Sequence, residues 1–436
     1  MEAAMQKRFK LLFIPTFLIF YLTNFSIAQE NNLYIKAGKF FDGKSNELIA
    51  NVIIHVLGKN IAEVGENIQI PDGAKVYDLR DMTVMPGLID CHTHVLLHPG
   101  DYDQEILRES YEYRAIYGVV DAEKTLMGGV TTVRDVGNEG AGYADLALRD
   151  AINNGLVPGP RMLVANQPVT PTGGYDLVGY SPYFKTPQIS WHADGPYGMR
   201  KLVRQLVKLG VDVIKIYMES YEKKQSSKDS LTGGINYTQE EVNALVDEAH
   251  RNGLKVAAHT YSDKAARMAI EAGVNSVEHG LYINEDTFRL MAEKNIYYVP
   301  TLLVYEQWRD SKIFGQISPQ DKIKLTNTVE KHIASFQRAL KTNVKIAFGT
   351  DTFEYPGTNS QELALMVKYG MKTIEALKSA TSVAAELLGI EKETGTIEKG
   401  KSADIIAFKG DPLRNVSVVE KVQFVMKEGK VYKFEK

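Results

Sequence analysis

Eight short apolar runs, separated by helical patterns, occupy the stretch from residue 86 to residue 391. The expected strands are residues 88–95, 131–136, 161–165, 211–217, 255–259, 274–279, 297–302 and 344–349. Between the fourth and fifth runs, Thr238 and Glu241 form a T-x-x-E capping box that opens an expected helix. Eight strands that are each followed by a helix predict an α/β fold, a (β/α)8 TIM-type barrel. In such a barrel the active-site groups lie at the C-terminal ends of the strands.

The two ends of the chain differ from this middle region. Short apolar or alternating runs, with turn signals at residues 58 and 71–73, fill the region before residue 86. Similar runs follow residue 391, with turn signals at 410–412 and 428–429. We therefore expect residues 29–85 and 392–436 to form one small β-sandwich domain. The barrel domain spans residues 86–391.

The first residues have the pattern of a signal peptide. Lys7, Arg8 and Lys10 precede an apolar run over residues 11–22, and the small-residue sequence S-I-A ends at Ala28. We expect residues 1–28 to be cleaved off, so that the protein is exported, periplasmic or secreted, with no membrane association after cleavage. The alternative is an uncleaved anchor, but the apolar run is shorter than the roughly 20 residues that span a bilayer.

Composition narrows the choice of partners. The chain has 436 residues, 44% hydrophobic and 24% charged, with a formal net charge of -3. Because no basic surface is indicated, a nucleic-acid partner is not expected. Cys91 is the only cysteine, so no intrachain disulfide can form. The sequence leaves a homo-oligomer open.

His92 and His94 end the first expected strand. Residues two apart on a strand point to the same face, so both imidazoles can reach one metal ion. Taken alone, the H-x-H pattern is a weak signal.

Lys215 lies inside the apolar run of the fourth expected strand. A barrel strand is apolar on both faces, so an unpaired charged lysine is costly there. Burial favours the neutral amine, which can take up carbon dioxide and become a carbamate able to bridge two metal ions. The alternative is an unmodified lysine paired with Asp351 or another carboxylate.

His259, His279 and Asp351 end the fifth, sixth and eighth expected strands. Together with His92, His94 and Lys215 they predict a site for two divalent ions at one rim of the barrel. A hydroxide bridging the ions would attack an amide-type C–N bond, and Asp351 would be the catalytic residue that passes the proton to the leaving nitrogen. The expected partner is a small-molecule substrate.

Other side chains are candidates for lesser roles. Tyr217 and Tyr261 point to the same rim, where they either bind substrate or pack with a solvated hydroxyl. Arg134 either binds a carboxylate or forms a structural pair with a nearby acid. His250 and His332 fall in expected helices, which lie on the outer ring of a barrel, so we leave them out of the site.

Several motifs coincide with these residues. They are M-P-G-L-I-D-C-H-T-H at 85–94, G-V-T-T-V-R-D at 129–135, I-K-I at 214–216, A-H-T-Y at 258–261, V-E-H-G at 277–280, G-T-D at 349–351 and G-T-I-E-K-G-K-S-A-D at 395–404. With them the chain resembles the amidohydrolase superfamily, in its imidazolonepropionase-like and Xaa-Pro dipeptidase-like branch.

The resemblance implies a division of the ligands between two ions, with zinc as the usual metal. His92, His94 and Asp351 would hold the first ion, His259 and His279 the second, and carbamylated Lys215 would bridge them. The lysine favours the binuclear, peptidase-like members over imidazolonepropionase itself, which is similar in motif but typically holds one metal.

Two loops depart from the pattern of similar dipeptidases. Those enzymes often carry Thr-Gly-Gly-His after the third strand, where this chain has Tyr175 after Thr172-Gly173-Gly174. Many also carry His-Gly before an asparagine after the eighth strand, where this chain has P-G-T-N at 356–359. We therefore count Tyr175 as a candidate substrate-binding residue and leave the substrate open.

These observations lead to three hypotheses about function. The leading one is an exported binuclear amidohydrolase acting on a dipeptide such as Xaa-Pro, an N-acyl amino acid or a cyclic amide. The second is a mononuclear imidazolonepropionase-like ring hydrolase or deaminase. The third is a non-catalytic binding protein on the same fold, because a fold alone does not imply activity.

Overall fold

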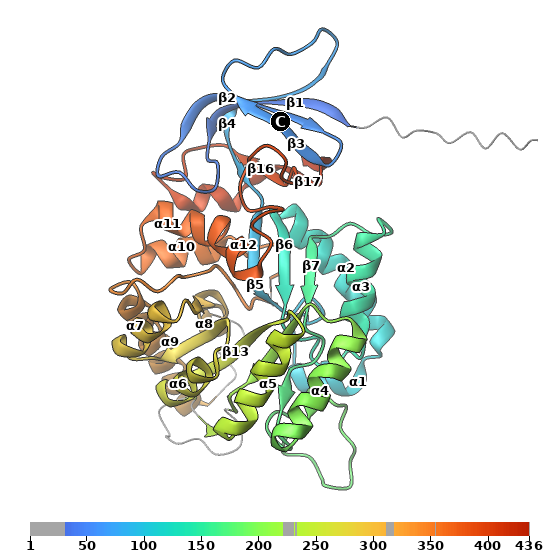
Figure 1. Cartoon of the computed structure of the whole chain (residues 1–436), viewed down its shortest axis with the longest axis vertical. Coiled ribbons are helices and arrows are strands. Elements are labelled where there is room, and N and C mark those ends of the chain that lie inside the picture. The colour runs from blue at the N-terminus through green and yellow to red at the C-terminus, as the bar shows by residue number, and fades with distance from the viewer. Residues whose placement is uncertain (1–30, 221–230, 232, 311–317, 354, 436) are drawn as a thin grey trace, which may run out of the picture. The chain divides into compact units, whose positions relative to one another are not determined.

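The computed structural model describes residues 31–220, 231, 233–310, 318–353 and 355–435 (Figure 1). The expected signal peptide, residues 1–28, lies outside the described residues. Among the described residues, no helix is both long enough and apolar enough to cross a membrane.

Both ends of the described chain contribute to one mixed sheet of seven strands, in the order β18-β17-β16-β4-β1-β2-β3. The strands are β1 (Asn32–Phe40), β2 (Ile49–Leu57), β3 (Asn60–Gly65), β4 (Lys75–Pro86), β16 (Ile405–Phe408), β17 (Val422–Lys427) and β18 (Lys430–Phe434), with the 3-10 helix η1 (Val416–Glu420). Antiparallel pairing of β16 with β4 joins the two ends, and apolar residues of both ends form one core. The expected small β domain built from both ends is confirmed.

The barrel strands fall close to the expected positions. They are β5 (Leu88–Thr93), β6 (Val130–Asp135), β7 (Arg161–Val164), β10 (Val213–Tyr217), β13 (Lys255–Ser262), β14 (Ser276–Tyr282) and β15 (Tyr297–Val299). Short strands β8 (Val169–Thr170), β9 (Trp191–His192), β11 (Glu219–Ser220) and β12 (Gly234–Ile235) lie in the connecting segments. The pairings β5-β6-β7 and β10-β13-β14-β15 are all parallel.

Backbone hydrogen bonds join these two groups of strands into a closed barrel. On one side, Asp212 N donates to Val164 O at 2.8 Å, between β7 and β10. On the other side the expected eighth strand, 344–349, is only an isolated bridge at Ile346. Ala347 N in this segment donates to the carbonyl of Tyr298 at 2.9 Å, and Cys91 N of β5 donates to Phe348 O at 2.9 Å. The (β/α)8 barrel is confirmed, with an irregular eighth segment.

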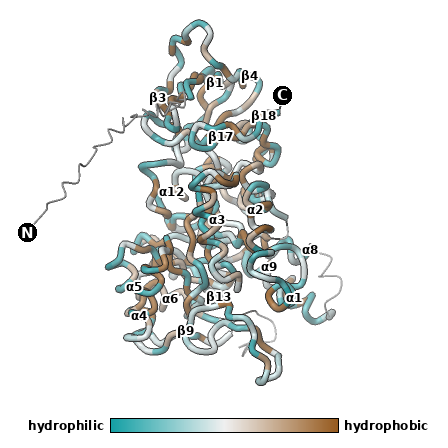
Figure 2. Tube along the Cα trace, turned by 90° about the vertical axis from the view of Figure 1, so that its right-hand side faces the viewer, coloured by the Kyte–Doolittle hydropathy of each residue, from teal (hydrophilic) through white to brown (hydrophobic). Residues whose placement is uncertain are grey.

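Helices follow the strands and cover the outside of the barrel. They are α1 (Tyr102–Arg108), α2 (Tyr111–Met127), α3 (Ala144–Asn153), α4 (Gly195–Leu209), α5 (Gln239–Arg251), α6 (Asp263–Ala272), α7 (Glu285–Glu293), α8 (Leu302–Asp310), α9 (Pro319–Ala339), α10 (Gln361–Lys368), α11 (Thr373–Ser379) and α12 (Ser382–Leu388). The capping box of Thr238 and Glu241 opens α5 as expected. Hydrophobic and hydrophilic stretches alternate along the helices, as expected for helices with one face on the core (Figure 2).

The alternation of side chains along β10 places Lys215 inside the barrel. Ile214 and Ile216 belong to the large core cluster that includes the helices, whereas Val213 belongs to a separate small cluster with Ala257 of β13. Successive side chains on a strand point to opposite faces. Lys215 therefore shares the inward face with Val213, and its backbone pairs in register with that of Ala257.

Candidate metal centre

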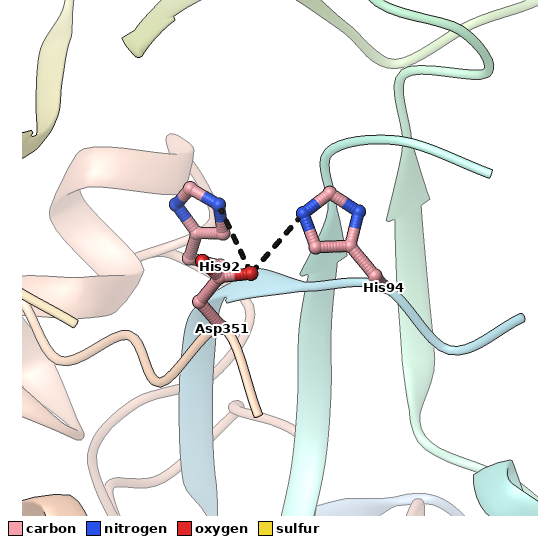
Figure 3. A group of neighbouring side chains, drawn as sticks. All are labelled: His92, His94 and Asp351. Atoms are coloured by element: carbon pink, nitrogen blue, oxygen red, sulfur yellow. Dashed lines mark ion pairs between the residues drawn. The ribbon is translucent and has the colours of Figure 1, made fainter. Parts of the chain in front are cut away.

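The six candidate ligands lie at one rim of the barrel. Lys215 Nζ lies 3.2 Å from His92 Nε2. Asp351 Oδ1 lies 3.3 Å from His94 Nε2 and 3.8 Å from His92 Nε2, so that three side chains surround one point (Figure 3). The ligand atoms of His92, His94 and Asp351 all lie within 4.8 Å of one another.

The remaining two histidines complete the group. His279 Nδ1 lies 3.9 Å from Asp351 Oδ2, and the His279 ring is 4.8 Å from the His92 ring between centroids. The His259 ring follows at 4.6 Å from that of His279. The structure thus brings together all six candidate ligands, which come from five strand positions of the barrel because His92 and His94 both lie at the end of β5.

The residues present fit a divalent metal ion. Both ring nitrogens of His259 are buried and have no hydrogen-bond partner among the described residues, although buried polar atoms are nearly always paired. The pKa of His259 lies well below its ordinary value. Burial of the ring is the larger cause, and the charge of Lys215 is the second. Imidazole nitrogens and carboxylate oxygens are among the ligands that bind zinc in proteins.

Three of the imidazoles are oriented by a hydrogen-bond partner of their Nδ1 atom. His92 Nδ1 lies 2.8 Å from Glu278 Oε2, and His94 Nδ1 lies 2.8 Å from Gly137 O. His279 Nδ1 lies 2.8 Å from Thr301 Oγ1. With the proton on Nδ1, the unprotonated Nε2 of each imidazole can bind a metal ion, the arrangement found around metal-binding histidines.

Glu278 also settles the role of Arg134. Arg134 is buried and donates to Glu278 Oε1 at 2.8 Å, to Ser276 Oγ at 3.0 Å and to Cys91 O at 2.6 Å. Of the two roles open for Arg134, the structure shows the structural pair. Its contact with the backbone of β5 holds the strand that carries His92.

Asp90 ties the first strand to the eighth segment. One carboxylate oxygen accepts from the backbone N–H groups of His92 and Thr350 at 3.0 and 3.1 Å. The other accepts from Thr350 Oγ1 at 2.6 Å and from Asn359 Nδ2 at 2.8 Å. Asp90 therefore fixes the spacing between His92 and the backbone that carries Asp351.

The backbone itself is strained around the centre. His279, Thr301 and Asp351 have φ angles of 65°, 51° and 56°, in the left-handed region that side chains other than glycine rarely adopt. His279 lies within β14, whereas Thr301 follows β15 and Asp351 follows the eighth segment. The surrounding hydrogen bonds hold them there.

Burial also sets the charge state of the lysine. The Lys215 side chain is 1% exposed, and its burial lowers the pKa of the amine to about 8 against the attraction of Glu278 and Asp351. A substantial fraction of the amine is therefore neutral near pH 8.

Two of the three candidate substrate residues contact His259, and the third contacts one of those two. Tyr217 stacks on the His259 ring at 4.3 Å, Tyr175 stacks on Tyr217 at 4.3 Å, and the Tyr261 ring lies 4.4 Å from that of His259. A contact between these residues and substrate stays a prediction.

The sequence did not indicate that two buried residues, Glu139 and His332, lie near the centre. Glu139, after β6, has Oε1 3.4 Å from His94 Nδ1. His332, placed on the outer ring from sequence, is 1% exposed, and its ring lies 5.0 Å from that of Tyr305, which in turn contacts His279. A polar residue soon after a strand end was the signal for Glu139, whereas the pattern of α9 gave none for His332.

A closed barrel with candidate nitrogen and oxygen ligands at the C-terminal rim is the arrangement typical of metal-dependent hydrolases. The sequence pattern of the amidohydrolase family matches residues 83–432. The chain belongs to the amidohydrolase family, and it is an enzyme that hydrolyses carbon–nitrogen bonds in small-molecule substrates.

Similar proteins agree with this placement. The ochratoxinase of Aspergillus niger is 30% identical over 439 residues, which cover 92% of this chain and 86% of that protein. The structure of a Xaa-Pro dipeptidase with bound methionine has a TM-score of 0.82 and 36% identity, over 92% of this chain and 100% of that one. A prolidase complexed with N-methylphosphonate-L-proline has a TM-score of 0.82 and 29% identity, over 93% of this chain and 100% of that one.

Proposed function

We propose that this chain is an exported, binuclear amidohydrolase that cleaves an amide-type C–N bond. The observation that carries the proposal is the buried Lys215 Nζ, 3.2 Å from His92 Nε2 and among the other candidate ligands. A charged ammonium in that place would repel a metal ion, whereas a carbamate on the same nitrogen offers two anionic oxygens. The lowered pKa of Lys215 favours the neutral amine that forms a carbamate.

The ligands divide into two sets. His92, His94 and Asp351 would hold a first ion, His259 with His279 would hold a second, and carbamylated Lys215 would bind both. The close grouping of the first three ligand atoms and the unpaired nitrogens of His259 support this division. Zinc suits the nitrogen and oxygen donors best.

The side chains at the rim carry the proton and the substrate. Divalent ions bound here would ionise a water near neutral pH and polarise the scissile carbonyl. Asp351, partly exposed at the rim, accepts the proton of the attacking water and delivers it to the leaving nitrogen. The rings of Tyr217 and Tyr261 contact that of His259, and we infer that their hydroxyls bind the carbonyl oxygen or a carboxylate of the substrate.

The substrate we favour is a dipeptide, with Xaa-Pro as the first to test. Support comes from the Xaa-Pro dipeptidase and the prolidase, which share the fold over nearly the whole described chain. An N-acyl amino acid or a cyclic amide is the next choice, since both present the same carbonyl and leaving nitrogen.

Export rests on the sequence of residues 1–28 alone. N-terminal sequencing of protein secreted by a Gram-negative host carrying the full chain tests it, with a new terminus at Gln29 expected. An intact N-terminus in the membrane fraction would contradict cleavage.

The metal content of residues 29–436 tests the binuclear centre. We expect about two ions per chain by elemental analysis, falling to one or none in Lys215→Ala. The matched control is Lys255→Ala, which changes a lysine at the start of β13, away from His259 on the same strand. This variant should keep both ions. The active preparation should release proline from Xaa-Pro dipeptides.

One ion per chain, unchanged in Lys215→Ala, would contradict the binuclear centre and favour the mononuclear ring hydrolase or deaminase. If the protein holds two ions but hydrolyses no dipeptide, N-acyl amino acid or cyclic amide, the substrate assignment is contradicted. The hypothesis of a non-catalytic binding protein would then remain.

A further inference from the structure

Two connecting segments pack against each other beside the metal centre. One contains α1, and the other runs from residue 171 to residue 190, after β8. Ile106 of α1 forms a buried apolar cluster with Leu177 and Ile189 of the second segment, and Tyr102 and Tyr175 pack on that cluster. The two segments therefore form one packed unit.

Glu139 fastens this unit to the barrel. Its Oε2 accepts a hydrogen bond from Tyr102 at 2.5 Å and another from Tyr175 at 3.1 Å, and the two hydroxyl oxygens lie 2.9 Å apart. We call these three residues the Glu139 network. It joins the end of β6 to both connecting segments through a single carboxylate.

The backbone of Glu139 is held as firmly as its side chain. The residue is 2% exposed and has a φ of 48°, a left-handed conformation that needs support from its surroundings. Arg114, itself buried, donates to Glu139 O at 2.6 Å and to Asn138 O at 3.2 Å. The carboxylate therefore has a fixed position relative to the barrel.

The network ends at the metal centre. Tyr175 stacks on Tyr217, which stacks on His259, with 4.3 Å between centroids in each pair. Glu139 Oε1 accepts no hydrogen bond from the described residues and lies 3.4 Å from His94 Nδ1. That nitrogen already has a closer partner in Gly137 O, at 2.8 Å, so orientation of His94 does not require Glu139.

We propose that Glu139 is a positioning residue for substrate selection: it fixes Tyr175 and Tyr217 as a rigid wall against which the substrate binds. This inference rests on the proposed function for the role of the wall. Losing the negative charge of Glu139 weakens the hydrogen bonds that hold Tyr102 and Tyr175, so the wall loosens although every candidate metal ligand stays in place.

Steady-state kinetics on an Xaa-Pro dipeptide tests the role in binding. We expect Glu139→Gln and Tyr102→Phe each to raise KM about tenfold, the effect of losing hydrogen bonds to a charged group, with little change in kcat. The double variant should raise KM no further than either single variant, because the two residues act through one network. Metal content should stay at the wild-type value.

Tyr180→Phe is the matched control. Tyr180 donates to Asp103 at 2.5 Å and so joins the same two segments at an exposed position, without reaching Glu139. Its KM should stay near that of the wild type. A loss of metal with a fall in kcat for Glu139→Gln would overturn the proposal, since Glu139 would then act on His94. So would an unchanged KM.

Hydrogen exchange gives a readout that needs no activity. Amides of residues 101–109 and 175–190 should exchange faster in Glu139→Gln than in the wild type or in Tyr180→Phe, while those of β5 and β14 keep their protection. If no dipeptide is hydrolysed but exchange is faster, the proposed substrate is wrong and the Glu139 network stands as a positioning element. Unchanged exchange would refute the network itself.

Discussion

Glu278 Oε2 lies 2.8 Å from His92 Nδ1, while the second oxygen of the same carboxylate pairs with Arg134 at 2.8 Å. The carboxylate is fully buried, and so is the imidazole. His92 therefore donates its Nδ1 proton to Glu278 and presents Nε2 to the centre of the barrel. A buried arginine thus fixes a histidine that it does not touch.

Removing the charge of Glu278 should weaken metal binding without removing a ligand. We expect Glu278→Gln to lower metal affinity about 10- to 100-fold, the usual effect of changing a hydrogen-bond partner of a ligand. Competition with a chromophoric chelator measures it. Glu271→Gln, at an exposed position on α6, is the control and should bind as tightly as the wild type. Equal affinity in both variants would show that Glu278 does not orient His92.

Recovery of metal-depleted protein should depend on pH through Lys215. Burial lowers the pKa of this amine to about 8, and only the neutral amine reacts with carbon dioxide. The neutral fraction rises with pH up to that value and then levels off. With dissolved carbon dioxide held constant and zinc in excess, the rate of reactivation should rise about tenfold per pH unit below 8. A rate independent of carbon dioxide would exclude carbamylation as the limiting step.

A methyl group at Gly137 should disturb both the Glu139 network and His94. The added Cβ would lie 2.7 Å from Glu139 Oε1 and 3.1 Å from His94 Cε1. The tyrosines hold the Glu139 carboxylate in place, so we expect Gly137→Ala to raise KM and also to weaken metal binding. Gly198→Ala, in α4 where the nearest atom lies 3.6 Å away, should change neither quantity. Wild-type kinetics in Gly137→Ala would mean that the carboxylate moves freely.

Glu248 should stabilise the protein only above strongly acidic pH. The pKa of Glu248 is lowered to about 2, chiefly by a hydrogen bond from Arg204 and further by one from Arg200. These contacts connect α4 with α5. A depressed carboxyl pKa contributes stability that is fully present above the ordinary value near 4.5 and is lost as the pH falls towards 2. Glu248→Gln should therefore lower Tm at pH 7 and converge on the wild type as the pH falls towards 2. A constant difference in Tm across that range would contradict the assignment.

The position of the candidate ligands could be predicted because each is a polar residue at or near the end of an apolar run. Parallel barrel strands are apolar on both faces and end at a common rim, so such residues converge. Lys215 is the clearest case, because an ammonium group in a buried apolar strand is costly unless it has a functional partner.

The eighth strand was harder to predict in detail. The run 344–349 has the composition of a strand, but the backbone at Gly349 passes so close to its neighbours that a Cβ there would meet Val299 at 2.4 Å and His92 at 3.0 Å. Regular pairing gives way to this close approach. Only the tertiary packing of β5 and β15 determines it.

Residues that act through others left almost no trace in the sequence. Glu139 follows β6 by a few positions, and its partners Tyr102 and Tyr175 lie 37 and 36 residues away along the chain. His332 lies on a helix whose pattern does not show that its ring reaches the buried Tyr305. Such relationships depend on how connecting segments fold back over the rim.

At His279, Thr301 and Asp351 the left-handed backbone lowers stability, while the side chains are needed for the candidate metal site. Each residue costs the folded state free energy that a glycine would not, of the order of 1 kcal/mol. Yet two of the three side chains are candidate ligands and the third orients one of them, so a glycine would remove the chemistry along with the strain. Selection for thermal stability alone would therefore tend to erode this rim first, and a thermostabilised form should gain its stability from positions elsewhere in the barrel.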